Sequence, residues 1–171
     1  IPKRDWSSDV CSSDLEKFKR VNNKVFRSSS FHSIDKKGRI IIPARFKSAL
    51  IKEQEKPGVM ISNKDECLYA YTFAEWEKVE SKILAAKTGN MAAFRRFFLG
   101  NSCECMLDSQ DRILIPKSLR EYACLEKEIV LVGNLDHFEI WNRNKWEEVN
   151  KKTEEKLKEP EVREEIASIG L

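Results

Sequence analysis

Hydrophobic and polar positions form the same pattern twice along this chain. Residues 35–47 read DKKGRIIIPARFK, and residues 108–120, which lie 73 positions downstream, read DSQDRILIPKSLR without a gap. Each copy has a polar turn and then a short run of Ile and Leu that is typical of a buried strand. A proline follows, which is well tolerated at the first position of a helix. A unit used twice indicates a tandem duplication.

Two further apolar runs continue the repeat downstream of each copy. Residues 58–62 and 67–71 follow the first copy, and residues 129–133 and 137–141 follow the second. β-Branched and aromatic residues recur in these runs, which favours strands. Each repeat is therefore predicted to contain strand, turn, strand, short helix, strand, turn, strand and helix, and the fold class is α+β.

Helical patterns lie between and after these blocks. Residues 73–84 are amphipathic, and residues 91–99 are predicted to form a second helix that links the repeats. The basic pair in that helix, Arg95 and Arg96, is interpreted as a solvated face, with a contact to the DNA backbone as the alternative. Asn142 is a favourable N-cap residue for the last helix.

The turn in each copy carries the candidate chemistry. Asp35 can accept a hydrogen bond from the backbone two residues on, and Gly38 can adopt positive φ at the end of the turn. Asp108 repeats the first of these positions. Asp111 replaces the glycine, and aspartate tolerates positive φ better than most residues, so the second turn is expected to have the same shape.

Two interpretations of the arginines that follow these turns, Arg39 and Arg112, remain open. Arginine can bind guanine bidentately or hold a phosphate, which would make both residues DNA contacts. Alternatively, each pairs with the aspartate four positions before it and braces the turn, and spacing alone favours this interpretation. The neighbouring Lys36 and Lys37 either bind DNA as well or belong to a solvated turn.

The two copies differ in charge, although the chain as a whole carries little net charge. The 171 residues are 41% hydrophobic and 35% charged, with a net charge of only +3, so any basic character must be local. Residues 35–47 carry five positive charges and one negative charge, whereas residues 108–120 carry three and two. On charge alone the first copy is the better phosphate binder.

The sequence gives little support for catalysis, metal binding, a membrane span or disulfide bonds. There is no phosphate-binding glycine loop, no Gly-x-Ser-x-Gly motif and no cluster of metal ligands, so we predict no catalytic residue, no metal site and no cofactor. His32 and His137 lie on predicted strands in different repeats. No apolar run reaches the roughly 18 residues of a membrane helix, and we expect a cytoplasmic protein without a membrane partner. The cysteines are too irregularly spaced for a disulfide framework: Cys11, Cys67, Cys103, Cys105 and Cys124.

The first residues of the chain do not fit the repeat. Residues 1–15 have no usable periodicity and resemble a translated sequencing adapter, and residues 16–24 are polar and basic. We expect residues 1–24 to be a non-native leader, with Val25 as the start of the natural sequence. A genuine disordered tail is the alternative.

The two Asp-x-x-x-Arg turns and their flanks resemble the MraZ family of bacterial regulators, over about residues 25–150. The resemblance is carried by Phe26-Arg27, 32–35, 37–39, 42–44, Leu107-Asp108, 111–116, Glu121-Tyr122, 130–133 and 138–141. It implies two tandem swapped-hairpin repeats of the AbrB type, which form a β-barrel with flanking helices. The implied organisation is a first SpoVT-AbrB-like repeat at 25–87, a linking helix at 88–100, a second repeat at 101–148 and a C-terminal helical tail at 149–171.

The resemblance also implies a function. Proteins of this family bind double-stranded DNA as ring homo-oligomers, here expected to be an octamer, at short G-rich direct repeats upstream of the division and cell-wall gene cluster. The chain would then be a transcriptional regulator of its own promoter, associated with the nucleoid. The implied DNA-binding residues are Arg39, Lys37, Lys36 and Arg112, with Asp35, Gly38 and Asp108 forming the turns.

Two departures from the family pattern stand in this sequence. Asp111 adds a carboxylate where a phosphate would approach, which weakens the case for Arg112. Ser28 occupies a position where a glycine usually follows Phe-Arg. An AbrB-like antitoxin or protein-interaction module is the alternative function, although two full copies in one chain argue against it.

Overall fold

The computed structural model describes residues 26–51 and 57–171. The predicted leader, residues 1–24, lies outside these residues. In the first repeat the elements are β1 (Ser29–Ser33), β2 (Arg39–Ile41), α2 (Ala44–Ile51), β3 (Gly58–Lys64), β4 (Cys67–Tyr71) and α3 (Phe73–Ala85). After α4 (Met91–Phe98) come β5 (Cys103–Met106), β6 (Arg112–Leu114), α5 (Lys117–Tyr122), β7 (Glu128–Asn134), β8 (His137–Asn142), α6 (Arg143–Lys156) and α7 (Pro160–Ser168). The predicted order of strands and helices is confirmed in both repeats.

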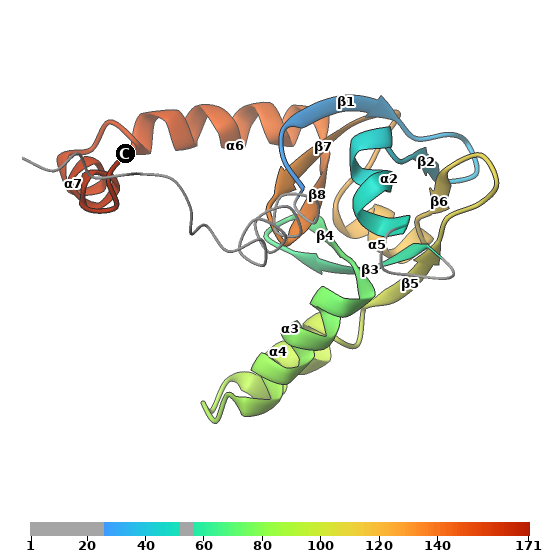
Figure 1. Ribbon diagram of the computed structural model, residues 1–171, viewed down its shortest axis with the longest axis horizontal. Helices are drawn as coiled ribbons and strands as arrows, with labels where there is room; N and C mark the ends of the chain where they lie inside the picture. Colours follow the sequence, from blue (N-terminus) through green and yellow to red (C-terminus); the bar gives the residue numbers. More distant parts are fainter. Residues whose placement is uncertain (1–25, 52–56) are drawn as a thin grey trace, which may run out of the picture.

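The strands form one six-stranded antiparallel sheet, in the order β1-β7-β8-β4-β3-β5, and a separate two-stranded ribbon, β2-β6 (Figure 1). The first strand of each repeat pairs with the third strand of the other: β1 with β7, and β5 with β3. The ribbon also joins the two repeats, because one of its strands comes from each. Neither repeat could complete its hydrogen bonding alone, so the two fold as one unit.

The β-barrel that the family resemblance implied is not closed in this chain. Strands β1 and β2 are connected by a tight turn, and the single bridge between Ile34 and Ile40 is the only ladder contact between them. Beyond that bridge β1 follows the edge of the sheet beside β7, while β2 turns away to pair with β6. Because the ribbon is not hydrogen-bonded into the edges of the sheet, the architecture is an open sheet with a ribbon across one face.

The core lies between this face of the sheet and the ribbon with its following helices. Ile40 and Ile113, the central residues of the ribbon, are fully buried. The rings of Phe26, Phe46 and Phe138 pack edge to face or tilted, with centroids 5.1–5.2 Å apart. Burying this apolar surface is the dominant stabilising contribution, and side chains from both repeats supply it.

The opposite face of the sheet carries a second cluster, called here the outer cluster. It comprises Cys67, Tyr69, Tyr71, Trp76, Ile83, Phe98, Val130 and Trp141, and α3, α4 and the start of α6 cover it. Strands β4 and β7 therefore contribute to both faces. Their apolar runs are almost continuous because both sides of the sheet are buried.

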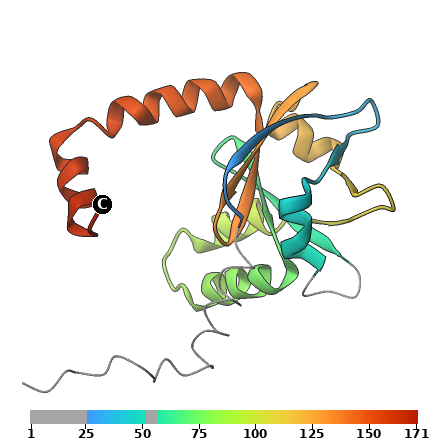
Figure 2. The same cartoon turned by 45° about the horizontal axis from the view of Figure 1, so that its top comes forward.

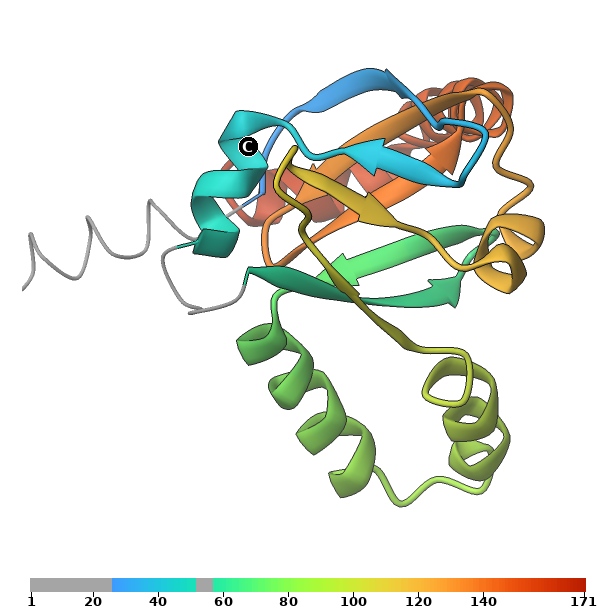
Figure 3. The ribbon, with the colours of Figure 1, turned by 90° about the vertical axis from the view of Figure 1, so that its right-hand side faces the viewer.

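Helices α3 and α4 form a hairpin that projects from the sheet (Figure 3). Of the basic pair that was predicted to lie on a solvated face, Arg96 is exposed, whereas Arg95 is partly buried. Its Nη2 donates to the Ile83 carbonyl oxygen at 2.9 Å, and a second, longer bond reaches the Leu84 carbonyl oxygen. A cation is favourable at these unpaired carbonyls at the end of α3, so Arg95 fastens the two helices together.

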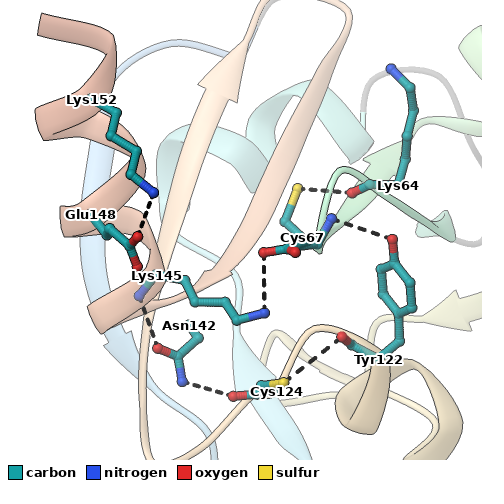
Figure 4. Close-up of polar contacts among 9 residues, drawn as sticks. Lys64, Cys67, Tyr122, Cys124, Asn142, Lys145, Glu148 and Lys152 are labelled. Carbon is teal, nitrogen blue, oxygen red and sulfur yellow. Dashed lines mark hydrogen bonds and ion pairs between the residues drawn. The ribbon is translucent and has the colours of Figure 1, made fainter. Parts of the chain in front are cut away.

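Helices α6 and α7 extend away from the sheet as an arm (Figures 1 and 2). Asn142 caps α6 as predicted, because its side chain accepts a bond from the Lys145 backbone N–H at 3.2 Å. Its amide also donates to the Cys124 carbonyl oxygen at 2.7 Å (Figure 4). The Lys145 ammonium lies 3.4 Å from a carboxylate oxygen of Glu66. Polar contacts thus hold the base of the arm. None of the helices within the described residues is both long enough and apolar enough to span a membrane.

Candidate nucleic-acid interface

The β2-β6 ribbon presents the two candidate arginines on one exposed face. In its register Ile40 lies opposite Ile113, Arg39 opposite Leu114, and Ile41 opposite Arg112. Because side chains alternate along a strand, the two central isoleucines point into the core and the other four residues point outward. Ile41 and Leu114 are each 56% exposed. The outward face is therefore a small apolar patch flanked by two guanidinium groups.

The ribbon has an approximate twofold axis between Ile40 and Ile113. The Ile42 N–H donates to the Asp111 carbonyl oxygen, and the Ile115 N–H donates to the Gly38 carbonyl oxygen, both at 2.9 Å. Figure 3 shows the two preceding turns at opposite ends of the ribbon, and Figure 1 shows both on the side remote from α6 and α7. The two copies of the sequence repeat are thus related by approximate twofold symmetry in the structure.

Each aspartate organises its turn through the backbone. One carboxylate oxygen of Asp35 accepts bonds from the N–H groups of Lys37 and Arg39, both at 2.9 Å. Asp108 does the same, with its bonds to Gln110 and Arg112 at 2.8 and 3.0 Å. The predicted role of both aspartates in forming the turns follows from these bonds.

The second carboxylate oxygen of each aspartate binds the arginine that follows. Arg39 donates from Nε and Nη2 to Asp35 at 2.7 and 2.6 Å, and Arg112 donates to Asp108 at 2.8 and 2.7 Å. Bonds from the backbone and side chain of Arg39 hold the pKa of Asp35 at about 2, and bonds from the side chain and backbone of Arg112 hold that of Asp108 at about 2. The bracing pair proposed from spacing is therefore present in both turns.

Lys36 and Lys37 lie at the exposed tip of the first turn. Within the described residues neither ammonium group has a carboxylate partner. The second turn has Ser109 and Gln110 at the same two positions. The difference in local charge that the sequence indicates is therefore a difference at the surface.

Position 38 and its counterpart 111 both adopt positive φ, as expected. Gly38 has φ +84°, and Asp111 has φ +59°. Their surroundings differ in a way that the sequence reading missed, because each contacts a helix of the other repeat. Asp111 forms an ion pair with Lys47 of α2, at 2.6 and 2.7 Å to its two oxygens, whereas Gly38 lies under the Arg120 side chain of α5.

The two histidines lie on strands in different repeats and are not brought together. His32 on β1 is hydrogen-bonded to Ser30 at 2.8 Å, and burial lowers its pKa. His137 on β8 stacks against Tyr69 with ring centroids 4.7 Å apart. Burial opposes its protonation, but the nearby carboxylates of Glu139 and Asp136 outweigh burial and raise its pKa. Among the residues that the structure describes, no group of His, Cys, Asp or Glu is arranged to hold a metal, and the cysteines there are free thiols.

The fold and the ribbon define a class: an α+β protein made of two intertwined repeats, each with an Asp-x-x-x-Arg turn. Over residues 25–99 and 97–165 the sequence matches the family described as "MraZ protein, putative antitoxin-like". The chain belongs to the MraZ family.

Relatives that carry the name "Transcriptional regulator MraZ" match most of the chain. The protein of Desulforapulum autotrophicum is 61% identical over 147 residues, which cover 86% of this chain and the whole of that relative. The protein of Desulfosudis oleivorans is 47% identical and that of Pediococcus pentosaceus 40%, each over 149 residues, 86% of this chain and the whole of the relative.

Proposed function

We propose that this chain is a sequence-specific DNA-binding transcriptional regulator whose β2-β6 ribbon and turns contact the DNA. One observation carries the proposal: Arg39 and Arg112 stand together on the outward face of an exposed two-stranded ribbon. The major groove admits a two-stranded ribbon, and arginine binds guanine there through two donors. The relatives' name and membership of the family support the same function.

The bracing aspartate is compatible with this role. Asp35 binds Arg39 through Nε and Nη2, and Nη1 makes no bond within the described residues. A side chain held in one rotamer loses less entropy on binding than a free one. The carboxylate therefore fixes the direction of the guanidinium while leaving donors for a base. Lys37 and Lys36 beside it would supply phosphate contacts.

The finer features of the proposal rest on membership of the family. We infer a swapped-hairpin relation to the AbrB fold, in which the exchange of β1 and β5 between repeats would be the swap. We further propose ring homo-oligomers, with eight subunits, that bind short G-rich direct repeats in the promoter of the division and cell-wall gene cluster, on the nucleoid. In such a ring several weak turns would gain from effective concentration.

Fluorescence anisotropy on DNA from upstream of the gene, with a scrambled duplex as reference, tests the proposal. Arg39→Ala is expected to lose about 2 kcal/mol of binding, roughly 30-fold, because a bidentate guanine contact is removed. Arg39→Lys keeps the charge and should still lose selectivity. Arg163→Ala on α7 changes the net charge equally and is the matched control. Equal binding by wild type and Arg39→Ala would contradict the mechanism.

An antitoxin-like or protein-interaction role is the second candidate, favoured by the wording of the family description. In that case the exposed Ile41 and Leu114 would contact a protein partner. Duplex DNA would then bind without selectivity, and Ile41→Ser would abolish capture of a toxin encoded beside the gene. Selective DNA binding that Ile41→Ser leaves intact would argue against this role.

A further inference from the structure

We propose that the two turns of one chain are unequal DNA contacts, because position 38 or 111 decides whether a cation from the other repeat is free. In the first turn Gly38 leaves Arg120 available for a DNA phosphate. In the second turn Asp111 binds the equivalent cation, Lys47, and closes that site. This inference rests on the proposed function and adds Arg120 to the DNA-contacting set.

The approximate twofold axis makes the two arrangements directly comparable. Lys47 and Arg120 occupy the same position in the repeat, as do Gly38 and Asp111. Each cation approaches the turn of the opposite repeat. The backbone bonds on either side of the ribbon are matched at 2.9 Å, so the difference between the turns lies in side chains and not in backbone shape.

At the first turn the cation has no carboxylate partner within the described residues. A Cβ at position 38 would lie 2.7 Å from Arg120 Nε and 2.8 Å from Cζ, so the guanidinium occupies the space that a side chain would need. Its Nε donates to the Ile115 carbonyl oxygen at 3.1 Å. This bond anchors Arg120 at the turn, and within the described residues neither Nη1 nor Nη2 makes a hydrogen bond.

At the second turn the same space contains a carboxylate. Asp111 binds Lys47 through both oxygens at 2.6–2.7 Å. The side chains of Lys47 and Asp111 are 32% and 39% exposed, so an approaching phosphate would meet a neutral pair instead of a free cation. Breaking that pair to form a phosphate contact would leave Asp111 close to a second negative charge, which is unfavourable.

An open surface pocket next to the first turn supports an anion site there. It has a volume of about 630 Å³ and is lined by both repeats, with Lys36, Arg120 and Lys127 as its cations. Two carboxylates also line it, Asp35 and Glu126. Asp35 is already occupied by the Arg39 guanidinium and by backbone N–H groups, so the positive charges dominate. A phosphodiester of a duplex seated on the ribbon is the proposed occupant.

The test exchanges the charge at the two positions and measures the salt dependence of DNA binding. Each phosphate contact contributes about 0.9 to the slope of log affinity against log salt, so one contact changes the affinity about threefold between about 50 and about 200 mM salt. Gly38→Asp should pair with Arg120 and give a slope shallower by about 0.9 than Gly38→Asn, which adds equal bulk without charge. Asp111→Asn should free Lys47 and steepen the slope by about 0.9.

A second substitution identifies the cation responsible. Adding Lys47→Met to Asp111→Asn should remove the gain in slope and affinity. Thermal melts of every variant verify folding, and both aspartate and asparagine tolerate positive φ at these positions. Equal slopes for Gly38→Asp and Gly38→Asn, together with a wild-type slope for Asp111→Asn, would overturn the inference. If Arg39→Ala still loses binding in that case, the proposed function stands and only the inequality of the turns fails.

Discussion

The first and second turns have the same backbone and different neighbours. Asp35 and Asp108 accept matching sets of bonds, and the arginines that follow bind them at nearly equal distances. Gly38 and Asp111, by contrast, meet different side chains from the opposite repeat. Local hydrogen bonds therefore fix the shape of each turn, whereas its charge depends on the side chains at its tip and on contacts between the repeats. Duplication preserved the first property and allowed the second to diverge.

The largest expected effect is a loss of stability on substitution in the β2-β6 ribbon, to which both turns lead. Ile40→Ala and Ile113→Ala should each destabilise the protein by about 3 kcal/mol, because each residue is fully buried opposite the other in the ribbon. Urea denaturation measures both. Their effects should be similar, since the approximate twofold axis passes between them. A loss under about 1 kcal/mol for one alone would show that the ribbon is not symmetric in energy.

The arginines should separate the turns by function. Arg39→Ala is expected to weaken binding of the cognate DNA by about 2 kcal/mol, and Arg112→Ala by under about 1 kcal/mol, because a paired carboxylate stands beside the second arginine. Titrations of both variants under one salt condition measure the difference. Equal losses would mean that both turns contact bases, and would contradict the inequality of the turns.

The dependence of stability on pH should be similar for the two turns. Both aspartates have a folded-state pKa of about 2, depressed below the ordinary value by the bonds they accept. Each therefore contributes stability that is present above about pH 4 and is lost as the pH falls towards about 2. Asn can still accept the backbone bonds through its oxygen, but its NH2 group would face the arginine donors. Asp35→Asn and Asp108→Asn therefore remove the charge together with the side-chain bonds from the arginine. Each variant should lose less stability than wild type between those pH values, and by a similar amount.

Periodicity and turn chemistry were enough to predict the order of the elements. The Ile runs, the prolines after them and the Asp-x-x-x-Arg spacing are local signals, and each corresponds to a local structure. The same spacing predicted the brace between Asp35 and Arg39. These features depend on residues at most four positions apart, so they can be predicted from the sequence alone.

The contacts between the two repeats could not be predicted from local sequence patterns. Lys47 and Asp111 are 64 positions apart, and only the fold brings them together. The expected barrel is not closed for a related reason. Closure depends on how far β1 and β2 diverge after the single bridge between them, which is not a local property of the sequence. Arg95 was misread since its partners, the Ile83 and Leu84 carbonyls, belong to the preceding helix. One signal was available for the charge difference: the repeat aligns Lys47 with Arg120 and Gly38 with Asp111.

The smallest expected effect addresses the divergent position itself. Asp111→Gly relieves a positive φ of +59°, which for a residue with a Cβ is unfavourable by roughly 1 kcal/mol. It also removes the partly exposed pair with Lys47, and such pairs contribute about 0–1 kcal/mol. The two changes should nearly cancel, to within about 0.5 kcal/mol of wild-type stability in urea. Asp111→Ala removes the pair but keeps the Cβ, so it should be the less stable of the two variants. If Asp111→Gly proved much less stable than wild type, the pair with Lys47 would be an important link between the repeats, and it would stabilise the fold as well as set the charge of the second turn.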